Sequence, residues 1–209
     1  MVKQSEGLLE KVETLPLHSR TPLAWGATAL ADPVALLIDH AFLEKKAANN
    51  AMALMTRWPG EWLDGWVETM TAVARDEAAH LAQVVRLLHK RGGRLERAHK
   101  SPYANALRAL VRNGGEAETL DRLFVSALIE ARSCERFAVL SESAVDAELA
   151  DFYRALFSSE LGHYRVFLKL AERIGSKPEV EARWQWMLAA EERILAQQPP
   201  GPRIHSGVA

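Results

Sequence analysis

The feature that most constrains this sequence is a glutamate inside each of four long apolar stripes. In each stripe the apolar residues recur every three or four positions, which is the period of an α-helix. A carboxylate buried without a partner costs several kcal/mol, so each of these glutamates must be protonated, paired or bound to a metal ion. The stripes therefore predict helices whose buried faces each carry a carboxyl group. The clearest stripe contains Phe152, Leu156, Glu160, His163, Phe167 and Leu170.

Helix-breaking residues set the limits of the expected helices. Asp32 and Pro33 are typical of an N-cap and a first helical residue, and this first long helix is expected to end at 58–60. The second long helix ends at Gly92 and Gly93, because glycine tolerates the left-handed conformation that follows a helix. No segment shows the strict alternation of a half-buried strand, so the sequence predicts an all-α fold. The expected helices cover 33–57, 61–90, 101–113, 117–143 and 146–174, with a shorter one after residue 178.

The composition fits one globular domain. A chain of 209 residues with 48% hydrophobic residues and a net charge of −1 is expected to form a single soluble domain over 1–195. The tail at 196–209 is rich in Pro and Gly and is expected to be disordered. The only cysteine, Cys134, excludes an internal disulfide framework and suits a reducing cytoplasm. No secretory signal and no apolar run of the ~18 residues that a membrane span needs is found, so we expect a cytoplasmic protein without a membrane partner.

The four glutamates fall into two matching halves. On the second helix His80 follows Glu77 by three residues, as His163 follows Glu160 on the fourth. The other two long helices each carry a lone glutamate on their stripe, Glu44 and Glu130. Each half is thus a helix with one Glu, a turn, and a helix with Glu-x-x-His, which is the arrangement of ferritin-like di-iron and di-manganese carboxylate bundles. We predict a ferritin-like antiparallel four-helix bundle with extra short helices and these metal ligands: Glu44, Glu77, His80, Glu130, Glu160 and His163.

Other residues compete for a place in this site. A third Glu-x-x-His pair, Glu96 with His99, lies among basic residues without an apolar stripe, and we interpret it as surface. Glu135 is a rival on the third helix, but it lies about 140° around the helical wheel from Glu130, on another face. The alternative to a metal site is a pair of buried polar networks, which leaves the matching lone glutamates unexplained.

Two further residues are candidates to support the ligands. His40 lies one turn before Glu44 and is either a ligand, a supporting residue or a core histidine satisfied by a neighbour. Asp76 is placed to accept a hydrogen bond from a ligand imidazole across the bundle, which would fix its tautomer; a solvated aspartate is the alternative. Cys134 is interpreted as a small core thiol.

Longer stretches around these residues resemble one known family. The segments DHAFLEKKAANNAMALM (39–55), ARDEAAHLAQV (74–84), ALIEARSCERFAVL (127–140) and FYRALFSSELGHYRVFLKLA (152–171) are similar to the tRNA 2-methylthio-N6-isopentenyladenosine hydroxylases, the MiaE family. The resemblance covers most of residues 17–175. It implies a non-haem di-iron monooxygenase that uses O2 and two electrons to hydroxylate the isopentenyl group of a modified adenosine beside the tRNA anticodon. It also implies an electron-donating reductase or ferredoxin-type partner, and its ligand pattern coincides with the six residues above.

The residue types agree with this chemistry. Carboxylate oxygens and imidazoles suit iron or manganese, and bridging glutamates can hold two metal ions about 3.5–4 Å apart. An unactivated C–H bond is beyond side-chain acid–base catalysis, so a metal centre must carry that step. Two other functions remain open: a ferritin-like oxidase that handles iron or peroxide, and a metal-free helical module that binds RNA.

One segment indicates RNA independently of the resemblance. Between residues 86 and 112 there are eight Lys or Arg against one acid, a local charge of +7. Such a cluster attracts a phosphate backbone through counterion release, although a solvated loop balanced by acids elsewhere is the alternative. The residues predicted to contact a tRNA anticodon stem-loop are Lys90, Arg91, Arg94, Arg97 and Lys100.

Overall fold

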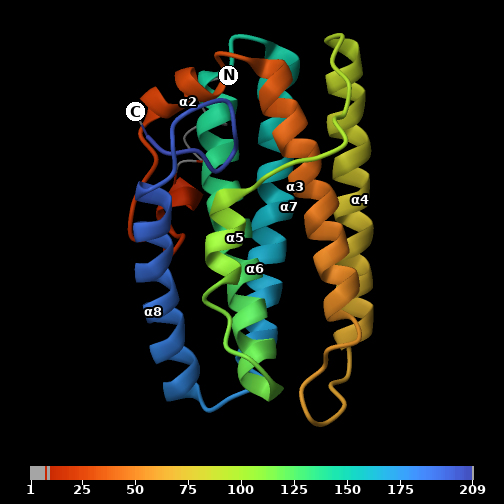
Figure 1. Ribbon diagram of the computed structural model, residues 1–209, viewed down its shortest axis with the longest axis vertical. Helices are drawn as coiled ribbons and strands as arrows, with labels where there is room; N and C mark the ends of the chain where they lie inside the picture. Colours follow the sequence, from red (N-terminus) through yellow and green to blue (C-terminus); the bar gives the residue numbers. More distant parts are fainter. Residues whose placement is uncertain (1–7, 9, 209) are drawn as a thin grey trace.

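Four long helices lie side by side and antiparallel in the computed structural model, which describes residue 8 and residues 10–208 (Figure 1). Helix α3 packs against α4, and α6 packs against α7. No strand occurs among the described residues, so the predictions of an all-α fold and of a four-helix bundle are confirmed. The bundle helices are α3 (Pro33–Leu54), α4 (Trp66–Lys90), α6 (Gly115–Ser143) and α7 (Ala147–Ala171).

Three shorter helices cover the bundle. Helix α2 (Leu23–Ala29), which the sequence patterns did not indicate, packs on α6, and α5 (Pro102–Arg108) bridges α6 and α8. Helix α8 (Lys177–Ala196) is the shorter helix expected after residue 178, and it lies along the outer side of α5 and α6 (Figure 1). Among the described residues no single helix is long and apolar enough to cross a membrane; only α2 and α3, with a bend of 99° between them, reach that length and hydropathy together.

The helix limits follow from the predicted caps. The Asp32 carboxylate accepts a hydrogen bond from the Ala35 N–H, and Asp146 caps α7 in the same way, which satisfies N–H groups that a helix leaves unpaired. Gly92 has a φ of +75°, the left-handed conformation expected after α4. Helix α4 begins five residues later than predicted, because Gly65 with a φ of +80° ends the preceding turn region.

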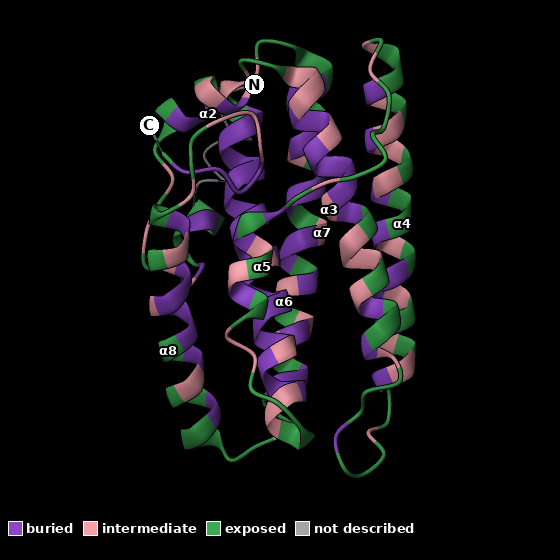
Figure 2. Ribbon diagram, in the orientation of Figure 1, coloured by how far each residue is buried: buried purple, intermediate pink, exposed green. Residues whose placement is uncertain are grey.

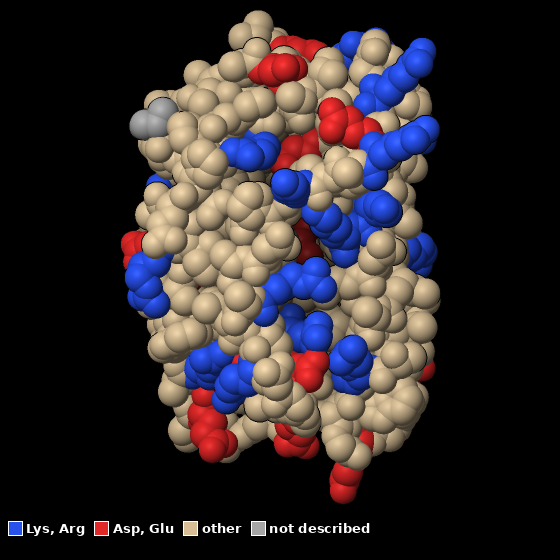
Figure 3. Space-filling model, viewed as in Figure 1, with Lys and Arg blue, Asp and Glu red and all other residues tan. Residues whose placement is uncertain are grey.

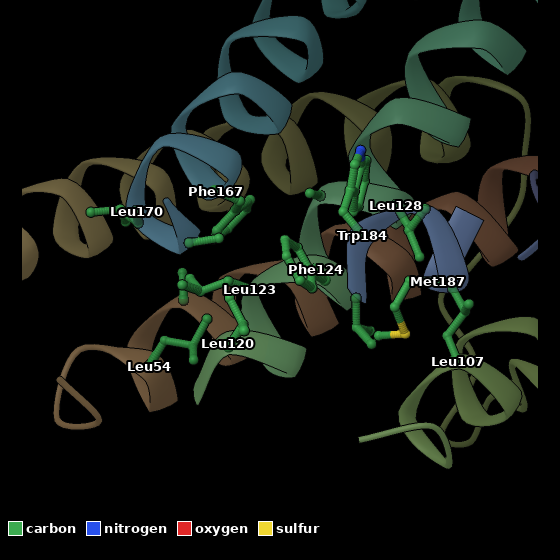
Figure 4. Packing of buried hydrophobic residues seen from close by; sticks show 14 of the residues in the cluster. Leu54, Leu107, Leu120, Leu123, Phe124, Leu128, Phe167, Leu170, Trp184 and Met187 are labelled. Carbon is green, nitrogen blue, oxygen red and sulfur yellow. The ribbon is translucent and has the colours of Figure 1, made fainter. Parts of the chain in front are cut away.

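Buried apolar residues form a cluster toward each end of the bundle. Figure 2 shows the buried faces of the long helices turned toward one another. One cluster joins the start of α6 and the end of α7 to α8, where Trp184 packs against Phe124 (Figure 4). The other joins the start of α3, the end of α4 and the start of α7. A third cluster, which includes Cys134 and Phe157, packs the N-terminal segment against α6 and α7. The interior between the two end clusters holds the polar residues of the four stripes.

The C-terminal residues differ from the expected disordered tail. Ile204 and Ser206 are buried, and the Ile204 N–H donates to Asp39 of α3. Trp25 of α2 donates its indole N–H to the Ser206 hydroxyl, and Arg136 of α6 donates to the Ser206 carbonyl. Contacts with α2, α3 and α6 therefore hold a segment whose own composition is typical of disorder.

Candidate metal centre

The six predicted ligands converge in the middle of the bundle. Each of the four long helices contributes one glutamate from its inward stripe, and all six side chains are buried. Two groups form, each with ligand atoms within 4.8 Å of one another, and Glu77 and Glu160 belong to both. The first group is Glu44, Glu77, His80 and Glu160; the second is Glu77, Glu130, Glu160 and His163.

The imidazoles face the carboxylates without forming regular hydrogen bonds. His80 Nδ1 lies 3.3 Å from Glu160 Oε1 and 3.5 Å from Glu44 Oε2, and His163 Nδ1 lies 2.7 Å from Glu77 Oε1. These atoms nevertheless have no hydrogen-bond partner of acceptable geometry. Buried polar atoms are almost always hydrogen-bonded, so a set of unpartnered lone pairs that meet at two points is the arrangement expected around two metal ions.

The electrostatics of the cluster lead to the same conclusion. Burial, and the charge of Glu160, raise the pKa of Glu77 to about 7, and burial raises the pKa of Glu130 well above its usual range. Burial alone would lower the pKa of His80, but the surrounding carboxylates of Glu160, Glu44 and Glu77 raise it to about 12. Four carboxylates cannot all be charged in one core without positive charge. Two divalent ions would balance four carboxylates with both imidazoles neutral, and oxygen with imidazole ligands suits iron or manganese.

His40 contacts Glu44 and lies outside both groups. Its Nε2 is 2.5 Å from Glu44 Oε1, and its ring packs against Phe137, Phe152 and Tyr153. Burial lowers the pKa of His40 to about 4, so the imidazole stays neutral. A neutral imidazole can donate one hydrogen bond, and His40 is placed to fix the orientation of the Glu44 carboxylate in this way.

Asp76 comes near a ligand but makes no direct hydrogen bond to it. Its Oδ2 lies 3.7 Å from His163 Nε2, which is beyond hydrogen-bond length. The side chain is 38% exposed and accepts hydrogen bonds from Arg75 instead. Asp76 thus faces the outer nitrogen of the imidazole from the rim of the site.

The rival residues are used elsewhere. Glu135 lies outside both ligand groups and pairs with Arg132 and Thr21, as the helical wheel indicated. His99 differs from its surface interpretation: its side chain is 10% exposed, its Nε2 lies 2.7 Å from Asp39, and its ring stacks on Phe42. The sequence did not single out Asp39, whose carboxylate contacts both His99 and the Ile204 N–H. The position of Asp39 one residue before His40 was the only sign that it lies near the site.

The five predicted tRNA contacts do not have equal charge environments. Lys90 Nζ lies 2.7 Å from Glu148, and Arg91 pairs with Asp146 and Glu148. The other three, Arg94, Arg97 and Lys100, are exposed and make no ion pair with any described residue. Figure 3 shows Lys and Arg side chains over α4 and down the middle of the same face, between α3 and α5.

Comparisons with known proteins agree on one family. The family model described as tRNA-(MS2IO6A)-hydroxylase, MiaE, matches residues 8–206. A Pseudomonas putida protein named tRNA 2-(methylsulfanyl)-N(6)-isopentenyladenosine(37) hydroxylase is 41% identical over 188 residues, covering 90% of each chain. A Salmonella typhimurium protein of the same name is 29% identical over an alignment of 240 positions, covering 92% of this chain and 88% of that relative.

A solved structure shares the architecture. Protein 43 with aldehyde deformylating oxygenase activity from Synechococcus superposes with a TM-score of 0.84 and 34% identity, covering 91% of this chain and 96% of that chain. The four stripes predicted a ferritin-like fold, and this oxygenase has the same architecture. With the sequence matches over nearly the whole chain, these similarities show that the chain belongs to the MiaE family of tRNA hydroxylases.

Proposed function

We propose that the chain is a non-haem di-iron monooxygenase that hydroxylates the isopentenyl side chain of 2-methylthio-N6-isopentenyladenosine beside the tRNA anticodon. The observation that carries the proposal is the cluster of four glutamates and two histidines with unpartnered lone pairs, in a chain of the tRNA hydroxylase family. Iron, O2 and a reductase or ferredoxin-type electron donor are parts of the proposal. Cytoplasmic tRNA is the expected substrate, so we also propose a cytoplasmic location.

Each proposed ligand has a defined place. His80 and Glu44 would hold one iron ion, and His163 and Glu130 the other, while Glu77 and Glu160 are shared. Six protein ligands leave coordination positions free on both ions. When bound, two iron ions would supply the reduction of O2 and the attack on an unactivated C–H bond, with one oxygen atom entering the substrate and the other leaving as water.

The surrounding residues keep this chemistry in a dry site. The apolar cluster at each end of the bundle separates the ligands from bulk water and offers an environment that a prenyl group prefers. His40 holds one oxygen of Glu44, so that the other oxygen faces the first group of ligands. The proposed phosphate contacts of the basic segment are Arg94, Arg97 and Lys100, which form no ion pair with a described residue. Lys90 and Arg91 form ion pairs with Asp146 and Glu148 instead.

Metal analysis and nucleoside mass spectrometry test the proposal together. Protein loaded anaerobically with ferrous iron should hold two irons per chain. With O2, a chemical reductant and tRNA from cells that lack the hydroxylase, it should add the mass of one oxygen atom to the isopentenyladenosine nucleoside. Two bound irons without this product would overturn the tRNA substrate and favour an oxidase that handles iron or peroxide. Less than one metal equivalent would leave the metal-free RNA-binding module.

A further inference from the structure

A cavity lies between α3 and α6, beside α5. Its volume is about 100 Å³ and its lining is Asn50, Arg108, Val111, Arg122 and Val125. We call this cavity, together with the adjoining Lys46, the α3–α6 seam. Asn50 of α3 donates a hydrogen bond of 2.9 Å to the Ser126 hydroxyl of α6, so a pair of polar side chains joins the two helices here.

The seam lies next to the ligand cluster along both helices. Ser126 precedes Glu130 by four residues, which is one turn or about 6 Å along the axis of α6. On α3, Ala47 is offset by about 60° from Glu44 around the helical wheel, toward the side of Asn50. Ala47 is half-buried and has no side chain beyond Cβ. Along these two helices the residues between the cavity and the glutamates, Ala47 and Ser126, thus have small side chains.

The groove on the opposite pair of helices has a thicker wall. That groove, between α4 and α7, has a volume of about 390 Å³ and includes Lys90 and Phe152 in its lining. Behind it the interior is filled by Val84, Leu88 and Leu156, which are buried in the apolar cluster of that end. Its Lys90 is also paired with Glu148. This groove is larger, but large apolar side chains separate it from the ligands.

Three cations gather at the seam, and of these only Arg122 is paired with an acid, Glu118. Lys46 and Arg108 make no ion pair with any described residue, and Lys46 Nζ instead lies 2.8 Å from His99 Nδ1. Partial burial lowers the pKa of Lys46, and the nearby charges of Arg108 and Lys45 lower it further against the opposite effect of Asp39. Cations that repel one another in this way bind an anion that relieves the repulsion. Figure 3 shows recessed acidic atoms among Lys and Arg side chains in the middle of this face.

We propose that the α3–α6 seam is the opening through which the modified base of the RNA reaches the ligand cluster, with Lys46 and Arg108 binding the phosphates beside that base. The inference rests on the proposed function and adds the face of the bundle and the residues that admit the substrate. An RNA fits this surface because it joins an anionic backbone, matched by the two cations, to an apolar prenyl group that can pass Ala47. Lys100, one of the exposed cations of the α4–α5 segment, precedes α5 and extends the contact toward that segment.

The first experiment compares two variants with the same change in charge. The seam variant is Lys46→Met/Arg108→Glu, and the control is Arg193→Met/Lys169→Glu, whose exposed cations lie on α8 and α7 and make no ion pair with a described residue. The probe is a fluorescent anticodon stem-loop RNA that carries N6-isopentenyladenosine, and its affinity is measured over a salt series. The seam variant should bind at least tenfold more weakly than the control. Its slope of log K against log salt should be shallower by about 1.4–1.8, the value for two lost phosphate contacts.

The second experiment tests proximity without weakening the binding. Cys134 is buried, so a cysteine introduced at exposed Asn49, beside the seam, can be labelled alone with a benzophenone photo-crosslinker. Light should crosslink this protein to the stem-loop RNA, and a matched cysteine at exposed Gln185 of α8 should give no crosslink.

The outcomes separate the opening from the function itself. A wild-type protein that binds no stem-loop RNA would overturn the proposed function along with the seam. If the wild type binds but the two double variants have equal affinities and slopes, or only the Gln185→Cys protein crosslinks, the seam is wrong while the tRNA substrate stands.

Discussion

Two buried glutamates on α6 allow metal binding to be separated from stability. Glu130 faces the ligand cluster, whereas Glu135, five residues later, accepts hydrogen bonds from Thr21 N and Thr21 Oγ1 and pairs with Arg132. Both side chains are at most 5% exposed. A change to glutamine at either position keeps the volume of the side chain, so the two variants differ in what the replaced carboxyl group contacts.

The expected effects are opposite. Glu135→Gln weakens a buried ion pair and should lower the free energy of unfolding by about 3 kcal/mol, which is a fall in Tm of about 6–12 °C for a chain of this length. It should keep both metal ions. Glu130→Gln should lose one or both metal ions. The stability of its metal-free form should change by less than about 1 kcal/mol, because burial raises the pKa of Glu130 and a neutral amide then replaces a neutral acid of the same shape.

Metal content by mass spectrometry and unfolding of the metal-free proteins in urea measure both effects on the same samples. The wild type, prepared with and without iron, gives the reference for each quantity. Loss of metal from the Glu135→Gln protein, or two bound metals in a Glu130→Gln protein, would refute the assignment of α6 residues. A large stability loss in metal-free Glu130→Gln would show that this carboxyl is charged and paired in the absence of metal.

Three further changes probe the site and its frame. Glu77→Ala or Glu160→Ala should lose one or both metals and RNA hydroxylation while the helical circular dichroism is kept, because the remaining helices still frame the site; two metals and normal turnover would contradict the ligand assignment. Asp121 is buried, yet hydrogen bonds from two arginines lower its pKa below the usual value of an aspartate, so its stabilisation is complete at neutral pH and is lost as the pH falls through the folded pKa. Asp121→Asn should therefore unfold at lower urea concentration at pH 7 and lose less stability on acidification than the wild type. Deletion of residues 199–209 removes buried Ile204 and should cost about 1.5–3 kcal/mol from that side chain alone, measured as a lower Tm.

The ligand cluster could be predicted because its signal is local in each helix. Glu160 and His163 share one stripe with Phe152 and Leu170, and helical geometry fixes which face such a stripe presents. Because the Glu-x-x-His motif occurs in both halves of the chain, the stripes could be matched with one another without knowing how the helices pack. Helix starts at Asp32 and Asp146 were predictable for the same reason, since a cap and its partner lie within three residues.

The remaining structure depends on partners far away in the chain. Lys90 and Arg91 look like free cations in their own segment, but their counterions lie 55 to 58 residues later in the sequence, at the start of α7. The Ile204 N–H reaches an acceptor 165 residues away, and nothing in the Pro- and Gly-rich tail indicates this. The spacing of residues predicts which side chains one helix buries or exposes. Whether a cation is paired, or a segment packs on the bundle, depends on which elements meet in the folded chain.

The two polar clusters in the core show why burial alone does not identify a metal site. Arg132 donates two hydrogen bonds of 2.9 Å to the carboxylate of Glu191, which also accepts one from the Tyr103 hydroxyl. Every oxygen of Glu191 is therefore satisfied by the protein itself, as a structural ion pair requires. In the other cluster, oxygens of Glu44, Glu77 and Glu160 and nitrogens of both imidazoles have no such partner. Carboxylates in that state are costly unless something outside the chain completes them, so the unsatisfied cluster is the one proposed to bind the metal ions.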